Sequence, residues 1–196
     1  NALFNGRRLG FGGRPYGAAY QTGGVDLAGV WNRALTADER TELYNFGKGK
    51  HQGNALALTD NNTVGSTTGK SGNAAIAVAA NSEYLSHADN AAFKITGEKC
   101  FAAWIYRETA GANMAILSER SSGNGNYQLY VDTNNKLHAY IADSSSGFSE
   151  PAINSPTIAE DTWTLVWMWY DPSDKKCYIQ ISDGTPSAGA ALTNGP

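Results

Sequence analysis

Charged residues are scarce in this chain. Only 17% of its 196 residues are Asp, Glu, Lys or Arg, and the formal net charge is −3. No basic stretch favours a nucleic-acid partner, and no basic amphipathic helix favours a membrane surface. No apolar run approaches the roughly 18 residues that a membrane-spanning helix needs. The composition therefore argues against nucleic-acid binding and against insertion into a membrane.

Cysteine is also rare, with two residues far apart in the sequence, Cys100 and Cys177. Neither belongs to a CxxC pair or to a Cys/His metal spacing. Each falls in an apolar, strand-like segment, where a cysteine behaves as a small buried hydrophobic residue. A disulfide is the alternative if the two strands adjoin. No signal peptide is recognisable, and a first residue Asn1 in place of Met is expected of a mature product or an excised piece.

Glycine, tyrosine and tryptophan are by contrast abundant, at 22, 10 and 5 residues. Short segments with period-two alternation recur between Gly-, Asn- and Pro-containing turns, which is typical of antiparallel strands. These segments are "CFAAWIY" (100–106), "YQLYV" (127–131), "LHAYI" (137–141), "WTLVWMWY" (163–170) and "CYIQIS" (177–182). The pattern predicts one all-β domain, a sandwich or jelly roll, large enough to fold alone.

The alternation also predicts which side chains share a face. In 100–106, Phe101, Ala103 and Ile105 oppose the even-numbered residues. In 163–170, the three tryptophans and Leu165 oppose Thr164, Val166, Met168 and Tyr170. Both faces of that segment are largely apolar, which predicts a central strand buried on both sides. The "DTNNK" stretch (132–136) predicts a hairpin turn between 127–131 and 137–141.

One helix is expected, near residues 37–46. The sequence Thr36-Ala37-Asp38-Glu39 has the form of a capping box, in which the first and last side chains bond each other's backbone N–H groups. Gly47 follows as a C-terminal stop. A short buried strand with Val25, Leu27 and Val30 precedes this helix.

The same segments carry a family resemblance over nearly the whole chain. The chain resembles the laminin G-like, concanavalin A-like lectin/glucanase superfamily, in the bacterial and phage branch that occurs as repeated modules. The most specific segment is "GVDLAGVWNRALTADERTELYNFGKG" (24–49). The resemblance implies a single laminin G-like domain over 1–196, folded as an antiparallel jelly-roll β-sandwich of concanavalin A type.

The order of the segments departs from that family. Residues 1–50 resemble the C-terminal part of such a module, and residues 55–196 resemble its N-terminal and middle part. The resemblance thus implies a circularly permuted module. Its origin could be one period of a tandem array, a permutant, or a subunit completed by its neighbours. In each case the strand at 24–31 is expected to pair with strands from the 55–110 region.

Catalysis is not expected. Retaining glucanases need two carboxylates about 5–5.5 Å apart, and the ExDxxE-like strand motif of the family's glucanases is missing here. The Arg/Glu and Gln/His strand pairs of its lyases are missing too. The three histidines, His51, His87 and His138, are scattered along the chain.

Sugar and calcium binding are the candidate chemistries. Exposed aromatic rings stack on sugar rings while polar side chains bond the hydroxyls. The candidate rings are Tyr16, Tyr20, Tyr106, Tyr130 and Tyr140, with Trp104 and Trp169 if these are exposed rather than packed in the core. The resemblance also implies a structural Ca²⁺ near Asp26, although this residue could equally cap a strand end.

The sequence therefore predicts a non-catalytic carbohydrate-binding or adhesion module at an extracellular, cell-surface or virion-surface location, with a glycan as partner. The alternative is a structural subunit that assembles with copies of itself, head to tail, by strand complementation.

Overall fold

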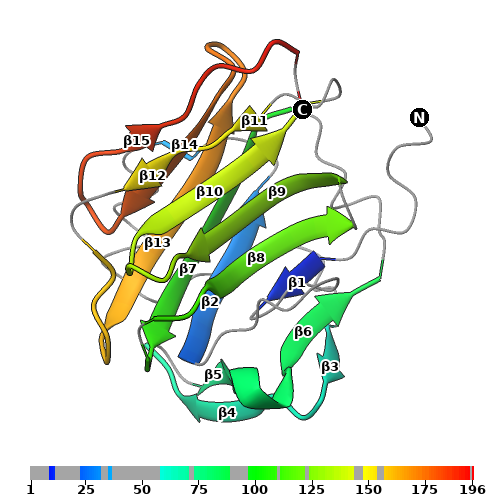
Figure 1. Cartoon of the computed structure of the whole chain (residues 1–196), viewed down its shortest axis with the longest axis vertical. Coiled ribbons are helices and arrows are strands. Elements are labelled where there is room, and N and C mark those ends of the chain that lie inside the picture. Colours follow the sequence, from blue (N-terminus) through cyan, green and yellow to red (C-terminus); the bar gives the residue numbers. More distant parts are fainter. Residues whose placement is uncertain are drawn as a thin grey trace.

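Period-two strands make up most of the regular structure. The computed structural model describes residues 9–11, 23–31, 35–36, 58–70, 73–88, 97–109, 111–121, 124–143, 148–153, 157–194 and 196. Within these ranges the strands form two antiparallel sheets, one of eight strands and one of seven. The sheets lie face to face (Figure 1), which confirms the predicted all-β sandwich.

The eight-stranded sheet contains the predicted hairpin, β9 and β10, joined by a turn at 132–136. In spatial order the sheet consists of β11 (Phe148–Ser149), β10 (Leu137–Ala142), β9 (Asn124–Val131), β8 (Met114–Ser121), β1 (Leu9–Phe11), β6 (Tyr84–His87) and β3 (Thr59–Asn61), with β12 (Ala152–Ile153) also paired to β10.

The seven-stranded sheet contains the apolar strand at 163–171 in an inner position, as predicted. In spatial order the sheet consists of β15 (Ser187–Ala188), β14 (Lys176–Ile181), β13 (Trp163–Asp171), β7 (Lys99–Arg107), β2 (Gly23–Trp31), β5 (Asn73–Ala77) and β4 (Gly65–Thr68).

Strand β2 lies inside the sheet of its own chain. It pairs with β5 on one side and with β7 on the other, both antiparallel. Figure 1 shows the blue β2 beside the green β7, although about 70 residues separate them in sequence. This confirms that the strand at 24–31 pairs with the 55–110 region, and the pairing is made within one chain.

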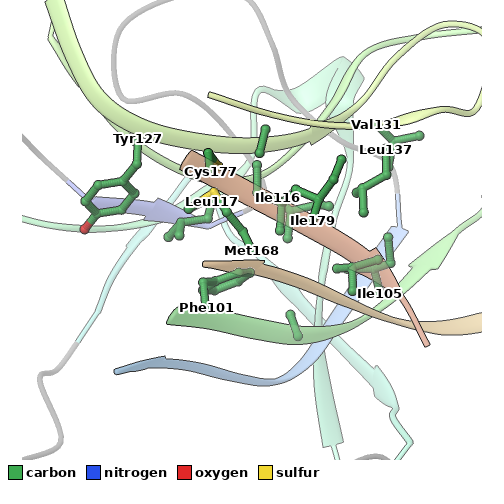
Figure 2. Packing of buried hydrophobic residues seen from close by; sticks show 14 of the residues in the cluster. Phe101, Ile105, Ile116, Leu117, Tyr127, Val131, Leu137, Met168, Cys177 and Ile179 are labelled. Atoms are coloured by element: carbon green, nitrogen blue, oxygen red, sulfur yellow. The ribbon is translucent and has the colours of Figure 1, made fainter. Parts of the chain in front are cut away.

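The interior cluster fills the space between the two sheets. It draws Phe101, Ile105, Met168 and Ile179 from the seven-stranded sheet and meets side chains from β8, β9 and β10 (Figure 2). Each fully buried large apolar side chain contributes about 1.5–3 kcal/mol. Phe101, Ala103 and Ile105, which were predicted to share one face, all belong to this cluster.

A second cluster, here called the outer cluster, covers the opposite face of the seven-stranded sheet. Its members are Leu35, Cys100, Ala102, Trp104, Leu165, Trp167 and Trp169, with Trp163 and Tyr178 partly buried against it. Strand β13 has apolar side chains on both faces, and both faces are covered, one by the interior cluster and the other by the outer cluster.

The two cysteines are buried and free. Cys100 belongs to the outer cluster and Cys177 to the interior cluster. They lie on opposite faces of one sheet with β13 between their strands, so they form no disulfide and act as small hydrophobic residues.

Some predicted and observed elements do not overlap. The predicted helix at 37–46 lies outside the described residues, and the part of the chain that the structure describes has one short 3₁₀ helix, η2 (Ala79–Asn81). The sequence did not predict β1, β3 or β4, each of which has three or four residues. No helix among the described residues is long and apolar enough to cross a membrane.

Candidate functional site

An aromatic pair lies on the outer face of the seven-stranded sheet. Trp163 on β13 faces Tyr106 on β7, and Tyr106 faces Gly24 on β2, so the three residues form one row across the sheet. The Trp163 and Tyr106 ring centroids are 5.5 Å apart and the rings are tilted by 48°. Both side chains are partly exposed, so the pair offers aromatic surface to a ligand.

The turn before β13 places a carboxylate at this pair. Asp161 adopts a left-handed backbone conformation, with φ of 53°, which Asp tolerates better than most residues. Its backbone N–H donates to the carbonyl of Arg107, over 2.8 Å. Its Oδ1 accepts a hydrogen bond from the Tyr106 hydroxyl at 3.2 Å. Burial raises the pKa of Tyr106, and the negative charges of Asp161 and Glu108 raise it further.

Arg107 fixes the end of β7 from inside. Its side chain is 1% exposed, and its guanidinium donates to the carbonyls of Thr109, Ala112 and Asp132 at 3.1, 2.8 and 3.3 Å. A planar guanidinium with several donors suits such a convergence of loop carbonyls. Arg107 therefore holds two loops at the same end of the sandwich as the aromatic pair.

Trp104 lies one row away from the aromatic pair on the same face. It is 5% exposed, and the ammonium of Lys70 lies 4.7 Å from its ring centroid. Trp169 is 8% exposed and stacks on Tyr178, with centroids 5.2 Å apart. The predicted sugar-binding role of Trp104 and Trp169 required exposed rings, and both rings are buried.

Tyr130 and Tyr140 lie on the opposite side of the molecule, on the outer face of the eight-stranded sheet. The register places Tyr130 opposite His138, and Tyr140 opposite Gln128. The imidazole of His138 stacks on Tyr130 with centroids 5.1 Å apart and an angle of 16°, so one face of the Tyr130 ring is covered. His138 Nε2 also lies 3.2 Å from a carboxylate oxygen of Asp132.

Asp132 organises the β9–β10 turn beneath this histidine. Its Oδ1 accepts the backbone N–H groups of Asn134 and Lys136, each at 2.8 Å. Burial alone would raise the pKa of Asp132, but these two hydrogen bonds and His138 outweigh it and lower the pKa. The carboxylate therefore serves the turn itself.

A comparison with protein-family models finds one match. A laminin G-like model, described as the concanavalin A-like lectin/glucanases superfamily, matches residues 79–196, more than half of the chain. The chain belongs to the concanavalin A-like lectin/glucanases superfamily. Neither the search of curated proteins nor the search of solved structures found a match. Membership in this superfamily makes the chain a lectin/glucanase-like β-sandwich module.

The predicted aromatic residues do not form a single site on this superfamily fold. Tyr106 lies on one outer face, Tyr130 and Tyr140 on the other, and Tyr16 and Tyr20 lie outside the described residues. Trp163 and Asp161 were not among the residues predicted from the sequence. The sequence "DTW" (161–163) could have indicated them, because it places a turn residue just before an aromatic residue that begins a strand. Side chains at the end of a strand are more exposed than those at its middle.

The calcium expectation has less support. Asp26 lies opposite Trp104 in the register of β2, immediately before an irregularity between residues 26 and 29. Among the described residues, no group of three or more His, Cys, Asp or Glu could hold a metal ion. A calcium site at Asp26 stays a prediction.

Proposed function

We propose that this module binds carbohydrate without catalysis and that it holds the sugar against Trp163. The observation that carries this proposal is the tilted Trp163–Tyr106 pair on the outer face of the seven-stranded sheet, with a carboxylate hydrogen-bonded to the tyrosine hydroxyl. It combines the apolar face of an aromatic ring with polar groups at its edge, which is the composition of a sugar site.

The geometry suggests how a sugar ring would bind. The apolar C–H face of the ring would stack on the exposed side of the Trp163 indole. The Tyr106 hydroxyl and the carboxylate of Asp161 would exchange hydrogen bonds with its hydroxyl groups. Because Asp161 is held by its backbone hydrogen bond to Arg107, the carboxylate is oriented before the ligand arrives, which lowers the entropic cost of binding.

A binding role fits the sequence better than hydrolysis. Glycoside hydrolysis requires two carboxyl groups on either side of the scissile bond, and the sequence lacks the strand motif that supplies them in the family's glucanases. We therefore propose an adhesion or glycan-binding role at an extracellular, cell or virion surface, where carbohydrate polymers are displayed.

A glycan array followed by titration calorimetry tests this function. We expect binding to at least one oligosaccharide and a loss of at least about tenfold in affinity for Trp163→Ala, since such a loss corresponds to about 1.4 kcal/mol. Tyr140→Ala on the opposite face is the matched control and should bind as the unmodified chain does. No binding across the array would refute the function, and loss of binding only in Tyr140→Ala would move the site to the other sheet.

Self-assembly is the second candidate. β2 pairs with β5 and β7 of its own chain, which favours assembly through another surface over strand exchange. A single-subunit mass in solution at high concentration would count against assembly by any other surface.

A further inference from the structure

We infer that the Trp163–Tyr106 site selects a sugar that carries a positive charge, namely an amino sugar with a free ammonium group. This inference rests on the proposed function and names the ligand class of the same site. Two features of the described residues support it, the partly exposed aromatic pair and the negative charges around it. A cation on the same face, Lys70, bears on how such a ligand would be oriented.

The two rings meet at an angle and do not form one flat surface. At a tilt of 48° and a centroid separation of 5.5 Å, they are neither parallel nor in a common plane. Because the rings contact each other, a cation would lie over the exposed side of the pair, where the negative face of a ring attracts it. An exposed aromatic face can therefore hold an ammonium group as well as the C–H face of a sugar.

The charges next to the pair are negative. The charges of Asp161 and Glu108 both act on the Tyr106 hydroxyl, and Asp161 is hydrogen-bonded to it. Within the part of the chain that the structure describes, neither carboxylate forms an ion pair. The nearby cation Arg107 is committed to three backbone carbonyls. An ammonium group on the ligand would therefore supply the positive charge that pairs with Asp161 and Glu108.

A cation of the chain itself already occupies the neighbouring ring. The Lys70 ammonium lies 4.7 Å from the centroid of Trp104, which is two residues from Tyr106 along β7. This is a cation–π contact on the same outer face of the sheet. It would also orient a cationic ligand, because Lys70 would repel the ligand's ammonium group from Trp104 and direct it toward Asp161.

Three oligosaccharides of equal length and linkage test the inference by calorimetry: β-1,4-linked glucosamine, its N-acetylated form and the corresponding glucose oligomer. We expect the glucosamine oligomer to bind about tenfold more tightly than the other two, in the range of a partly desolvated cation–π contact. Added salt should reduce this preference, because exposed charges are screened.

Charge variants give the direction of the effect. For the glucosamine oligomer, Asp161→Asn and Glu108→Gln should each weaken binding severalfold, and Lys70→Gln should strengthen it. Asp183→Asn, at an exposed turn outside the site, is the control and should change nothing. The opposite signs would indicate an anionic ligand and overturn the inference.

The possible failures are distinguishable. If the three oligosaccharides bind equally and all lose affinity in Trp163→Ala, the charge preference is wrong and the proposed function stands. If the N-acetylated or the glucose oligomer binds more tightly, the inference is also wrong. If nothing binds on the glycan array, the proposed function itself fails.

Discussion

The indole of Trp163 lies against Gly24, two strands away across the seven-stranded sheet. A methyl group added at Gly24 would come within 2.9 Å of the Trp163 Cη2 atom. The next contacts would be Cζ2 of the same ring at 3.5 Å and the carbonyl oxygen of Ala75 at 3.6 Å. The absence of a side chain at position 24 therefore allows the ring to lie on the sheet, and this glycine determines the height of the proposed binding surface.

Gly24→Ala should fold but bind sugar more weakly. The backbone at Gly24 is not in the left-handed region, so alanine can adopt it, and the atom it meets is the far end of a side chain that can shift. We expect a destabilisation of roughly 1–3 kcal/mol from overpacking, a changed tryptophan emission and reduced affinity. Gly97→Ala, with nothing within 4 Å, is the control. Unchanged affinity in Gly24→Ala would show that Trp163 is not the binding surface.

Lys99 is a buried cation in the sandwich interior. Its side chain is 3% exposed, and its Nζ has no hydrogen-bond partner among the residues that the structure describes. Nζ lies 5.4 Å from the ring centroid of Tyr127, which marks one end of the interior cluster in Figure 2. Burial lowers the pKa of Lys99 from 10.5 to about 8, and the negative charge of Glu119 offsets only part of this effect.

This pKa predicts that stability rises with pH between about 8 and 9. In that range the unfolded chain, with an ordinary lysine pKa of 10.5, binds more protons than the folded chain. Above pH 9 the raised pKa of buried Cys177 acts in the opposite direction, and above pH 10 the raised pKa of buried Tyr127 does so too. Lys99→Met should remove the rise and stabilise the fold at pH 7 by roughly 1–3 kcal/mol. Denaturant unfolding from pH 7 to 10 measures this, with Lys136→Met as control. A slope that persists in Lys99→Met would assign it to another group.

The sequence predicted the long strands and their inward faces because period-two alternation is unambiguous where one face is buried. Phe101, Ala103 and Ile105 alternate cleanly, and they all lie in the interior cluster. Short strands escaped prediction because three residues such as Leu9, Gly10 and Phe11 carry no measurable period, and their pairing depends on neighbours distant in sequence.

The candidate site was harder to predict. The sequence shows that Tyr106 and Trp163 are aromatic residues on strands, but not that their strands are adjacent and in register. Trp104 and Trp169 looked equally suited to sugar binding. They differ from Trp163 only because Leu35 and the rest of the outer cluster bury them, which is a long-range effect that no local pattern contains.

Arg107 should be essential for stability. Replacing it with methionine would keep much of the volume but leave the carbonyls of Thr109, Ala112 and Asp132 without their donors. Hydrogen bonds from a charged donor contribute about 1.5–3 kcal/mol each, with incomplete additivity, so we expect a loss of roughly 2–4 kcal/mol by chemical denaturation. Arg107→Lys keeps the positive charge without the planar, branched guanidinium and should recover only part of the lost stability. Full recovery would show that the charge matters and the geometry does not.

Calcium at Asp26 is testable by thermal unfolding. An ion that binds only the folded state stabilises it by about 3 kcal/mol at a hundredfold excess over Kd. If Asp26 holds Ca²⁺, a chelator should lower the melting temperature by several degrees, and Asp26→Ala should abolish the response. Asp183→Asn is the control for a general charge effect. Equal melting temperatures with calcium and with chelator would show that no stabilising Ca²⁺ binds at Asp26.

We expect the first 50 residues to be necessary for folding, because they contain the inner strand β2. Val25 packs against the interior cluster, and β2 separates β5 from β7. Without it, the inner edge of β7 would expose unpaired backbone groups at the centre of a sheet, where they would promote aggregation.

We expect a chain of residues 51–196 to be insoluble or molten, with little near-ultraviolet circular dichroism. Adding a peptide of residues 1–50 should restore cooperative unfolding, because the missing strand can pair without a covalent connection. A truncated chain that is compact and unfolds cooperatively by itself would show that β2 is dispensable. It would also refute the expectation that residues 1–50 complete the module in permuted order.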